Sequence, residues 1–334
     1  MSSKVTFQKR PELGLREVVQ ELNGRPESTE KVSDERAHQI KAAVTAVYSA
    51  PSALDALDTF WNWGYHDPDL EREIESYVPN FNRYPSDGFS EQLYFVALRQ
   101  LPVDIKDYGN RSVLEVGCGM GEGLNFLSRV VDPKSMTGLD LSAAAIARAK
   151  AKLDRGPRLR YIQGDAEDLP FEDDSFDVVI NVESSHNYPD LGRFLDEVAR
   201  VLKPGGYFSY LDISGPVGLG RIDAERNVPR ALEWIGSRDI SKHVKESISR
   251  RMRPDSVFME AGRRKYPSPP IIRGMMRTER EAAAGSYFIG RISRAERIAR
   301  TLGLIPKVVE GGVRMTGGVP ITRYVHHWAR KTVY

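Results

Sequence analysis

The chain has 334 residues, of which 40% are hydrophobic and 28% charged, values that are ordinary for a water-soluble globular protein of one large domain or two. Its single cysteine, Cys118, excludes an internal disulfide and any metal site built from several cysteines. The formal net charge of +2 conceals an asymmetry, because residues 215–334 hold 24 Lys and Arg against 11 Asp and Glu, whereas residues 1–214 hold 24 against 35.

The basic C-terminal part suits an anionic partner such as an acidic substrate, a nucleic acid or an anionic membrane surface. The alternative is that it neutralises the acidic part across a shared or homo-oligomeric interface. No apolar run approaches membrane-spanning length, and the first residues lack the apolar core of a signal peptide, so we expect no membrane span and a cytoplasmic protein. His326 and His327 would face opposite sides of a strand, so we expect no metal site.

Residues 1–105 are predicted to form an N-terminal arm and a helical cap. The first 35 residues are polar and interrupted by prolines and glycines, which indicates a poorly ordered arm or an oligomer contact. Ala37–Tyr48 has helical periodicity, an aromatic segment follows at Phe60–Asp67, and Phe89–Leu101 is again helix-like.

The segment from Arg111 to Leu127 carries the strongest signal. Val113–Val116 is typical of a short buried strand and is followed by glycines at 117, 119, 121 and 123, after which a helical pattern begins. Such a turn lets a ligand approach the backbone closely and offers it free N–H groups. The dinucleotide-binding pattern would require a glycine where Glu122 stands, and no Walker lysine follows, so neither of those motifs is supported.

Strands and helices then alternate, which predicts an α/β core with a parallel sheet over residues 106–214. The second strand ends in Asp140, where a carboxylate accepts hydrogen bonds from ribose hydroxyls in nucleotide-binding folds; a surface Asp without a ligand is the alternative. Later strands are expected at Leu159–Gln163, Phe176–Asn181 and Tyr207–Ile213.

Residues 215–290 are irregular and basic, with helix-like stretches at Ala231–Trp234 and His243–Met252, and are predicted to form a helical lid inserted after the fifth strand. Residues 291–334 are expected to complete the core sheet. Ile292–Leu304 would supply its last helix, and the two closing strands would be Pro306–Val309 and Tyr324–Trp328.

The motif Glu-x-Gly-x-Gly-x-Gly from residue 115, the strand end at Asp140 and the loop Gly164-Asp-Ala-Glu-Asp168 together resemble class I S-adenosylmethionine (SAM) dependent methyltransferases. The resemblance implies a Rossmann-like, seven-stranded, mostly parallel sheet with an N-terminal cap and an inserted lid, and SAM as the cofactor. It also implies that Tyr65 contacts the methionine part of SAM and that Asp165 receives the adenine amino group. The implied cofactor-binding residues are Tyr65, Glu115, Gly117, Gly119, Gly121, Asp140, Leu141, Asp165, Ala166 and Asn181.

The block Asn181-Val-Glu183-Ser-Ser-His186-Asn-Tyr188-Pro resembles that of the phthiotriol and phenolphthiotriol dimycocerosate methyltransferases, and more distantly that of sterol methyltransferases. We interpret His186 as a general base for an alcohol acceptor, since histidine titrates near neutral pH, with Glu183 orienting it or binding the acceptor. The alternative is that His186 only shapes the pocket or holds the loop.

The predicted function is methylation of a small molecule at an oxygen of a polyketide, lipid or other secondary metabolite. The basic lid leaves room for an acidic group on this substrate. Carbon methylation of an isoprenoid or polyketide is the nearest alternative. An RNA methyltransferase and a SAM-binding protein that does not methylate are further alternatives; we find no RNA-binding module and expect no nucleic-acid partner.

Overall fold

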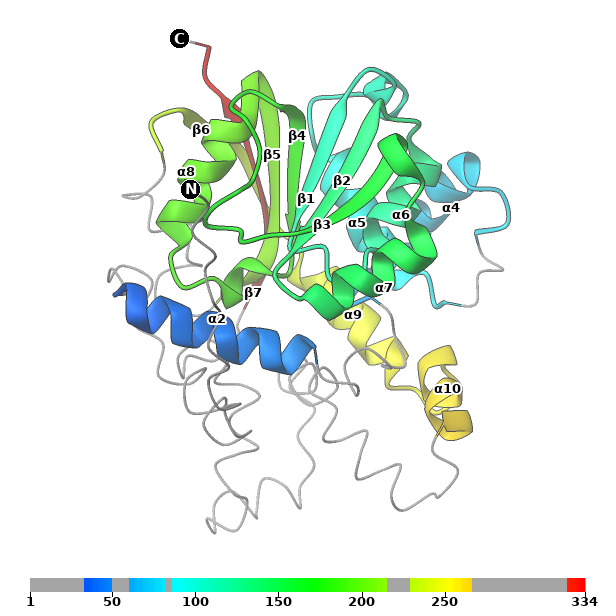
Figure 1. Cartoon of the computed structure of the whole chain (residues 1–334). Helices are drawn as coiled ribbons and strands as arrows, with labels where there is room; N and C mark the ends of the chain where they lie inside the picture. The colour runs from blue at the N-terminus through cyan, green and yellow to red at the C-terminus, as the bar shows by residue number, and fades with distance from the viewer. Residues whose placement is uncertain (1–32, 50–59, 82–85, 215–228, 266–322, 334) are drawn as a thin grey trace.

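The computed structural model describes residues 33–49, 60–81, 86–214, 229–265 and 323–333, and in this part of the chain it shows a seven-stranded sheet with helices on both faces (Figure 1). The strands lie in the order β3-β2-β1-β4-β5-β7-β6. β7 runs antiparallel to β5 and β6, and the other neighbouring pairs are parallel. The predicted Rossmann-like, mostly parallel sheet is therefore confirmed. The strands are β1 (Ser112–Val116), β2 (Ser135–Asp140), β3 (Leu159–Gln163), β4 (Phe176–Val182), β5 (Leu202–Ser214), β6 (Leu232–Asp239) and β7 (Arg323–Lys331).

The strand order places a topological switch point between β1 and β4. From β1 the chain builds outward to β2 and β3, and it then returns to the other side of β1 to form β4 and β5. Because the parallel strands all end at the same edge, the loops after β1, β2 and β4 meet there. Ligands of open α/β sheets bind in this crevice.

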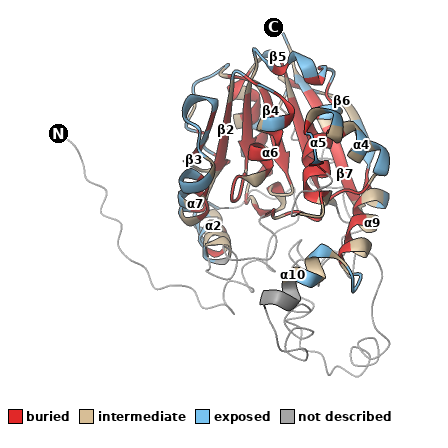
Figure 2. Ribbon diagram, turned by 90° about the vertical axis from the view of Figure 1, so that its right-hand side faces the viewer, coloured by how far each residue is buried: buried red, intermediate tan, exposed pale blue. Residues whose placement is uncertain are grey.

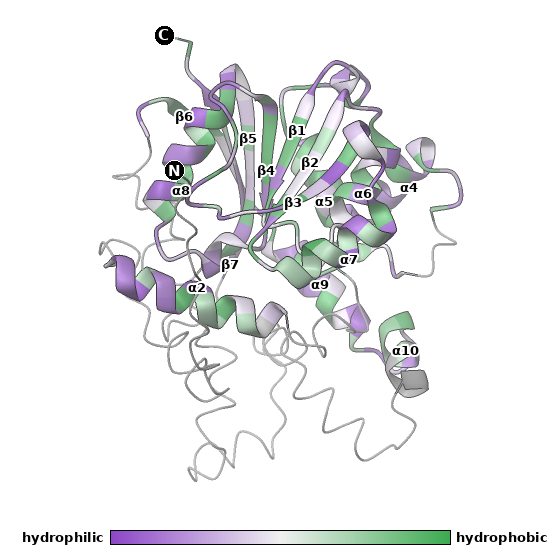
Figure 3. Ribbon diagram, viewed as in Figure 1, coloured by the Kyte–Doolittle hydropathy of each residue, from purple (hydrophilic) through white to green (hydrophobic). Residues whose placement is uncertain are grey.

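Helices cover the sheet because alternate strand residues point to opposite faces, and both faces are apolar. Val113 and Val178 pack in the cluster that also contains α5 and α6 side chains, whereas Leu114 and Val179 pack with α8. Figure 2 shows the buried residues running through the sheet, and Figure 3 shows that its central strands are largely hydrophobic. The described α-helices are α2 (Asp34–Tyr48), α4 (Pro68–Tyr77), α5 (Phe89–Arg99), α6 (Glu122–Val130), α7 (Ala143–Leu153), α8 (Leu191–Val201), α9 (Ser241–Arg251) and α10 (Val257–Lys265). Short 3₁₀ helices span η2 (Ile105–Tyr108), η3 (Gly156–Arg158) and η4 (Ser185–Asn187).

Helix α2 lies across one end of the sheet, beside the loops that follow the strands (Figure 1). It begins after Ser33, whose side chain accepts a hydrogen bond from the Arg36 N–H at 3.3 Å, and acidic residues in its first turn favour the positive end of the helix dipole. Hydrophilic and hydrophobic residues alternate along it (Figure 3), and Ile40 and Ala43 are fully buried. The helix thus lies over the switch point with these two residues buried.

The described residues correct one predicted element and confirm others. The helix predicted at Ala231–Trp234 is wrong, because residues 232–239 form the edge strand β6. A short apolar run has no decisive period of its own, and here its pairing with β7, at Leu232 opposite Lys331, decides the structure. The helix expected at His243–Met252 is confirmed as α9, and the strand expected at Tyr324–Trp328 lies within β7.

Several predicted elements lie outside the described residues, namely residues 1–32 of the arm, the helix Ile292–Leu304 and the strand Pro306–Val309. The division into cap, core and lid therefore stays a prediction apart from β6. In the described ranges every helix is too short or too polar to cross a membrane.

Candidate active site

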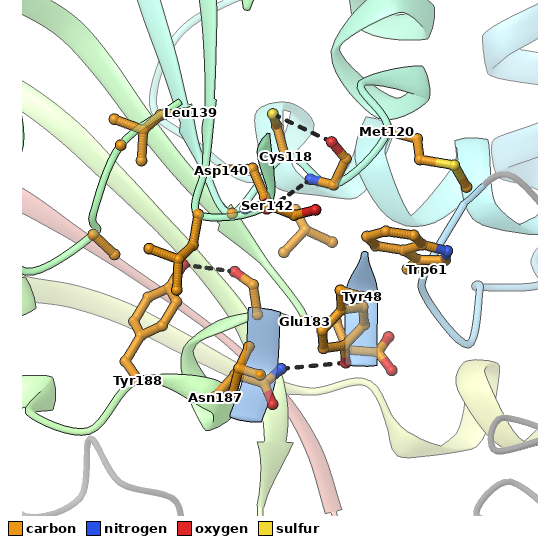
Figure 4. A pocket seen from close by; sticks show the side chains of 18 of the residues that line it. Tyr48, Trp61, Cys118, Met120, Leu139, Asp140, Ser142, Glu183, Asn187 and Tyr188 are labelled. Atoms are coloured by element: carbon orange, nitrogen blue, oxygen red, sulfur yellow. Dashed lines mark hydrogen bonds between the residues drawn. The ribbon is translucent and has the colours of Figure 1, made fainter. Parts of the chain in front are cut away.

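A cavity opens where the loops after β1, β2 and β4 meet, and helix α2 closes one side of it (Figure 4). It encloses about 910 Å³ of empty space, part of which is open to solvent. Of the twelve predicted site residues, seven line it and five do not. Those that line it are Gly117, Gly119, Asp140, Leu141, Asp165, Ala166 and Glu183.

The glycine loop forms the floor of the cavity. Gly119 has a φ of +52°, and a Cβ built on it would lie 2.9 Å from the Trp61 ring. A Cβ on Gly117, whose φ is +78°, would lie 2.3 Å from Ser184 Oγ. Side chains at either position would therefore have a strained backbone and would collide with Trp61 or Ser184, which line the cavity. Gly121 does not line the cavity; it precedes α6, and its carbonyl accepts a hydrogen bond from the Tyr161 hydroxyl at 2.8 Å.

Asp140 joins the end of β2 to the glycine loop. Its Oδ2 accepts the Gly119 N–H at 2.8 Å, and its Oδ1 accepts the Ser142 N–H, also at 2.8 Å. Burial raises the pKa of Asp140, although these two backbone donors oppose the shift. A carboxylate has about four acceptor positions, so this one keeps room for donors from a ligand in the cavity. Leu141 places an apolar side chain beside it.

Glu115 lies behind the cavity wall instead of lining it. Its carboxyl group is completely buried in β1 and accepts a hydrogen bond from the hydroxyl of Tyr94, which does line the cavity, at 2.7 Å. Its Oε2 has no hydrogen-bond partner among the described residues. Burial raises the pKa of Glu115 to about 8, against the lowering effect of the Tyr94 hydroxyl. Glu115 is thus protonated in the folded protein at neutral pH.

The free energy of unfolding is expected to depend on pH through Glu115. Between about pH 4.5, the ordinary value, and about pH 8, the folded state holds a proton that the unfolded state has lost. The stability that this proton contributes is present at low pH and declines as pH rises, by up to about 1.4 kcal/mol per pH unit. Glu115→Gln should remove this slope, as urea unfolding between pH 5 and pH 8.5 would measure. The exposed control Glu172→Gln should keep it; equal slopes in wild type and Glu115→Gln would contradict the assignment.

The loop after β3 is tied to helix α2. Asp165 Oδ2 and Glu167 Oε2 each lie 2.6 Å from Lys41 Nζ, and Asp165 Oδ1 accepts the Glu167 N–H at 2.9 Å. Ala166, between the two carboxylates, is buried in the wall of the cavity. The residue predicted to receive an adenine amino group therefore also carries an ion pair that the sequence did not indicate.

Two residues predicted to contact the cofactor do not line the cavity. Tyr65 does not line the cavity, because its ring stacks on His243 with centroids 4.4 Å apart. Trp61, four residues earlier in the same aromatic segment, lines the cavity instead (Figure 4). Its ring packs on that of Tyr48, with the ring centroids 5.0 Å apart. Asn181 is fully buried beneath the cavity.

Asn181 holds the loops together instead of facing a ligand. Its Nδ2 lies 2.9 Å from the Val116 carbonyl, 2.8 Å from Ser184 Oγ and 3.0 Å from Tyr188 Oη. The amide thereby joins the end of β1 to the segment after β4. Tyr188 and Ser184 line the cavity in its place.

Glu183 is the first residue after β4 and lines the cavity. Its φ of +52° is unfavourable for a residue with a side chain, and such strain is typical of functional sites. Its Oε2 accepts the Trp63 N–H and the Tyr324 hydroxyl, both at 2.9 Å. These donors hold the carboxylate at the cavity wall, where it can meet a polar group of a bound molecule.

His186 forms a pair with Asp212, a residue that the sequence analysis missed. The imidazole Nδ1 lies 2.8 Å from Asp212 Oδ1, and Asp212 Oδ2 accepts the Ser185 hydroxyl at 2.6 Å. Burial would raise the pKa of Asp212, but His186 and the Ser185 hydroxyl lower it overall. The sequence could have indicated Asp212, because it is an acidic residue in the C-terminal part of a strand, β5, in the same way that Asp140 is the last residue of β2.

The second imidazole nitrogen of His186 faces a residue of the cavity wall, although His186 itself does not line the cavity. Its Nε2 lies 3.0 Å from Nδ2 of Asn187, which is a cavity residue. The same amide nitrogen lies 3.4 Å from the hydroxyl of Tyr48 on α2 (Figure 4). One amide group thus separates the His186–Asp212 pair from the cavity.

Comparisons with known proteins agree with this geometry. A family profile described as a methyltransferase domain matches residues 114–210. A phthiotriol/phenolphthiotriol dimycocerosates methyltransferase of Mycobacterium tuberculosis is 47% identical over 191 residues, which are 57% of this chain and 66% of that protein, slightly under two thirds of its length. A probable second enzyme of this name from Mycobacterium ulcerans is 38% identical over 225 residues, covering 64% of this chain and 82% of that protein. A fatty-acid O-methyltransferase of Mycolicibacterium smegmatis is 46% identical over 154 residues, covering 46% of this chain and 52% of that protein.

Solved structures share the fold at low sequence identity. The [4+2]-cyclase SpnF superposes with a TM-score of 0.52 at 18% identity, covering 93% of this chain and 100% of that one. A geranyl diphosphate C-methyltransferase of Streptomyces coelicolor, in complex with Mg²⁺, geranyl diphosphate and S-adenosyl-L-homocysteine, has a TM-score of 0.51 at 14% identity, covering 88% and 98%. At such identities these neighbours show the fold alone, and they include more than one kind of chemistry.

Proposed function

Because the chain belongs to the SAM-dependent methyltransferase family that contains the phthiotriol/phenolphthiotriol dimycocerosate methyltransferases, we propose that it transfers a methyl group to a hydroxyl oxygen of a lipid or polyketide-type small molecule. The observation that carries the choice of oxygen is the His186–Asp212 pair beside the cavity. An alcohol must lose a proton as it is methylated, whereas many other acceptors need no base.

The cavity residues fit SAM. Asp140 keeps acceptor capacity for ribose hydroxyls, Leu141 and Ala166 supply apolar walls for an adenine ring, and Gly119 brings the backbone to the cavity surface. Asp165 offers acceptor positions beyond those used by Lys41 and Glu167. When bound, SAM supplies an electrophilic methyl group on a sulfonium.

The residues around the acceptor have separable roles in this proposal. Asp212 accepts a hydrogen bond from Nδ1 of His186, and this fixes the tautomer in which Nε2 is the basic nitrogen. An acceptor hydroxyl that takes the place of the Asn187 amide would meet Nε2, which then receives the proton that the hydroxyl loses. Glu183, whose carboxylate lies at the cavity wall, would bind and orient the acceptor. Alignment of the two reactants can contribute up to about 7–11 kcal/mol, and the base a further 10²–10⁴-fold in rate.

The proposal is tested by incubating the purified chain with methyl-labelled SAM and a panel of acceptors. Long-chain alcohols, phenols, fatty acids, an isoprenoid diphosphate and RNA represent the competing classes. Mass spectrometry should locate the label on oxygen of a hydrophobic alcohol or phenol. Label on carbon would support C-methylation, with Glu183 stabilising a cation, and would contradict the proposal, as would label in RNA.

A further inference from the structure

Lys41 on α2 joins the helix to the loop that would hold the adenine of SAM. Its ammonium group lies 2.6 Å from one oxygen of Asp165 and 2.6 Å from one oxygen of Glu167. The Lys41 side chain is only 21% exposed, and that of Glu167 is 3% exposed. Burial lowers the pKa of Lys41, but its hydrogen bonds to Asp165 and Glu167 and their charges raise it overall, so Lys41 is an ammonium group at neutral pH.

Glu167 extends this connection to the loop after β4. Its second oxygen, Oε1, accepts the N–H of Asp190 at 2.6 Å, and Asp190 is the N-cap of α8. The Lys41 ammonium therefore holds a buried carboxylate that is bonded at the same time to the segment following His186. Three stretches of chain that border the cavity therefore meet at the Glu167 carboxylate, namely α2, the loop after β3 and the start of α8.

Two hydrogen bonds between neutral groups also join this region to the site. Ser49, just after the helix, hydrogen bonds to Ser142 at 2.8 Å, and the Tyr48 hydroxyl lies 3.4 Å from Asn187 Nδ2. Val44 and Thr45 line the cavity. Charge-assisted hydrogen bonds are roughly twice as strong as neutral ones, so Lys41 attaches α2 to the cavity rim more strongly than these two neutral contacts do.

We propose that Lys41 is the positioning residue that latches α2 over the cofactor, so that retention of SAM and of its demethylated product depends on this double ion pair. The inference rests on the proposed function, because it needs the cavity to be the SAM site. Removal of Lys41 leaves Glu167 as an uncompensated buried charge, which favours displacement of α2 and entry of water. If Lys41 instead competed with adenine for Asp165, removal of Lys41 would make the protein retain SAM and its product more tightly.

The experiment measures dissociation of radiolabelled S-adenosylhomocysteine from the purified full chain. Lys41→Met should release it about tenfold faster or more, and Lys41→Arg should restore most of the retention because arginine keeps the charge. The contrast between Lys41→Arg and Lys41→Met reads out the charge itself, because both side chains are long and only arginine keeps a cation, a difference that a merely structural role would not produce. Lys150→Met, which removes an exposed lysine from α7, is the matched control and should release at the wild-type rate.

Hydrogen exchange adds a second readout on the same proteins. Amides of residues 34–48 should exchange faster in Lys41→Met than in wild type, while those of β1 and β4 stay protected, which separates release of the helix from unfolding. Retention that is unchanged or tighter in Lys41→Met would overturn the latch and leave the proposed function standing. Failure of the wild-type chain to bind S-adenosylhomocysteine would overturn the proposed function, and the latch with it.

Discussion

His186→Ala is expected to lower the rate of methyl transfer to a hydroxyl acceptor by about 10²–10⁴-fold, the usual contribution of a positioned base. SAM affinity should be unchanged, because His186 does not line the described cavity and is separated from it by the Asn187 amide. Single-turnover rates with labelled SAM, combined with calorimetric titration of SAM, measure the two effects separately.

Asp212→Asn tests the same assignment from behind the imidazole. Both oxygens of Asp212 accept hydrogen bonds, from His186 Nδ1 and from the Ser185 hydroxyl, so an amide NH₂ must face one of these donors. Where the NH₂ faces Nδ1, His186 must carry its proton on Nε2 and cannot act as the base there, so turnover should fall. His38→Ala, on the exposed side of α2, is the control. Near-normal turnover in both His186→Ala and Asp212→Asn would mean that His186 only holds the loop.

Asp140→Ala is expected to weaken SAM binding by about 100-fold or more. Hydrogen bonds to a charged group contribute about 1.5–3 kcal/mol each, and the proposed site places two ribose hydroxyls on this carboxylate. The same substitution leaves the Gly119 and Ser142 N–H groups without their acceptor, which loosens the glycine loop. Calorimetric titration with SAM gives the affinity directly.

Two controls separate lost contacts from lost structure in this measurement. Asp154→Ala removes a carboxylate from an exposed loop and should bind SAM normally. Thermal unfolding of Asp140→Ala without ligand shows how far the loop contributes to stability. Binding within a few-fold of wild type, in a protein with an unchanged unfolding temperature, would show that the ribose is held elsewhere.

The sheet was predictable because its signals are local. The apolar runs of β1 and β4 are buried on both faces, and the glycines between β1 and α6 are required by backbone conformations that depend on a few neighbouring residues. The edge strand β6 was missed because its pattern alternates weakly, and its structure depends on pairing with β7, about ninety residues away in sequence.

The residues of the site likewise divide into those that the sequence predicts and those that depend on tertiary packing. Asp140, Asp165 and Glu183, which the sequence predicts as site residues, line the cavity because each lies at or just after the end of a parallel strand, and these strand ends meet at one edge. The aromatic segment before the core was also recognised, but sequence could not tell which of its rings faces inward. Tyr65 turns to His243 and Trp61 turns to the cavity, a choice made by packing against α9 and α2.

The sequence by itself thus determined the α/β sheet, the glycine loop and the strand-end carboxylates, because these depend on residues close together in the chain. Only the tertiary structure decided that Asp212 supports His186, that Lys41 reaches Asp165 and Glu167, and that Asn181 braces the loops. Lys41 lies 124 residues from Asp165 in the chain. Such partners are brought together by the packing of elements that lie far apart in the chain, and this packing cannot be predicted from a local pattern of residues.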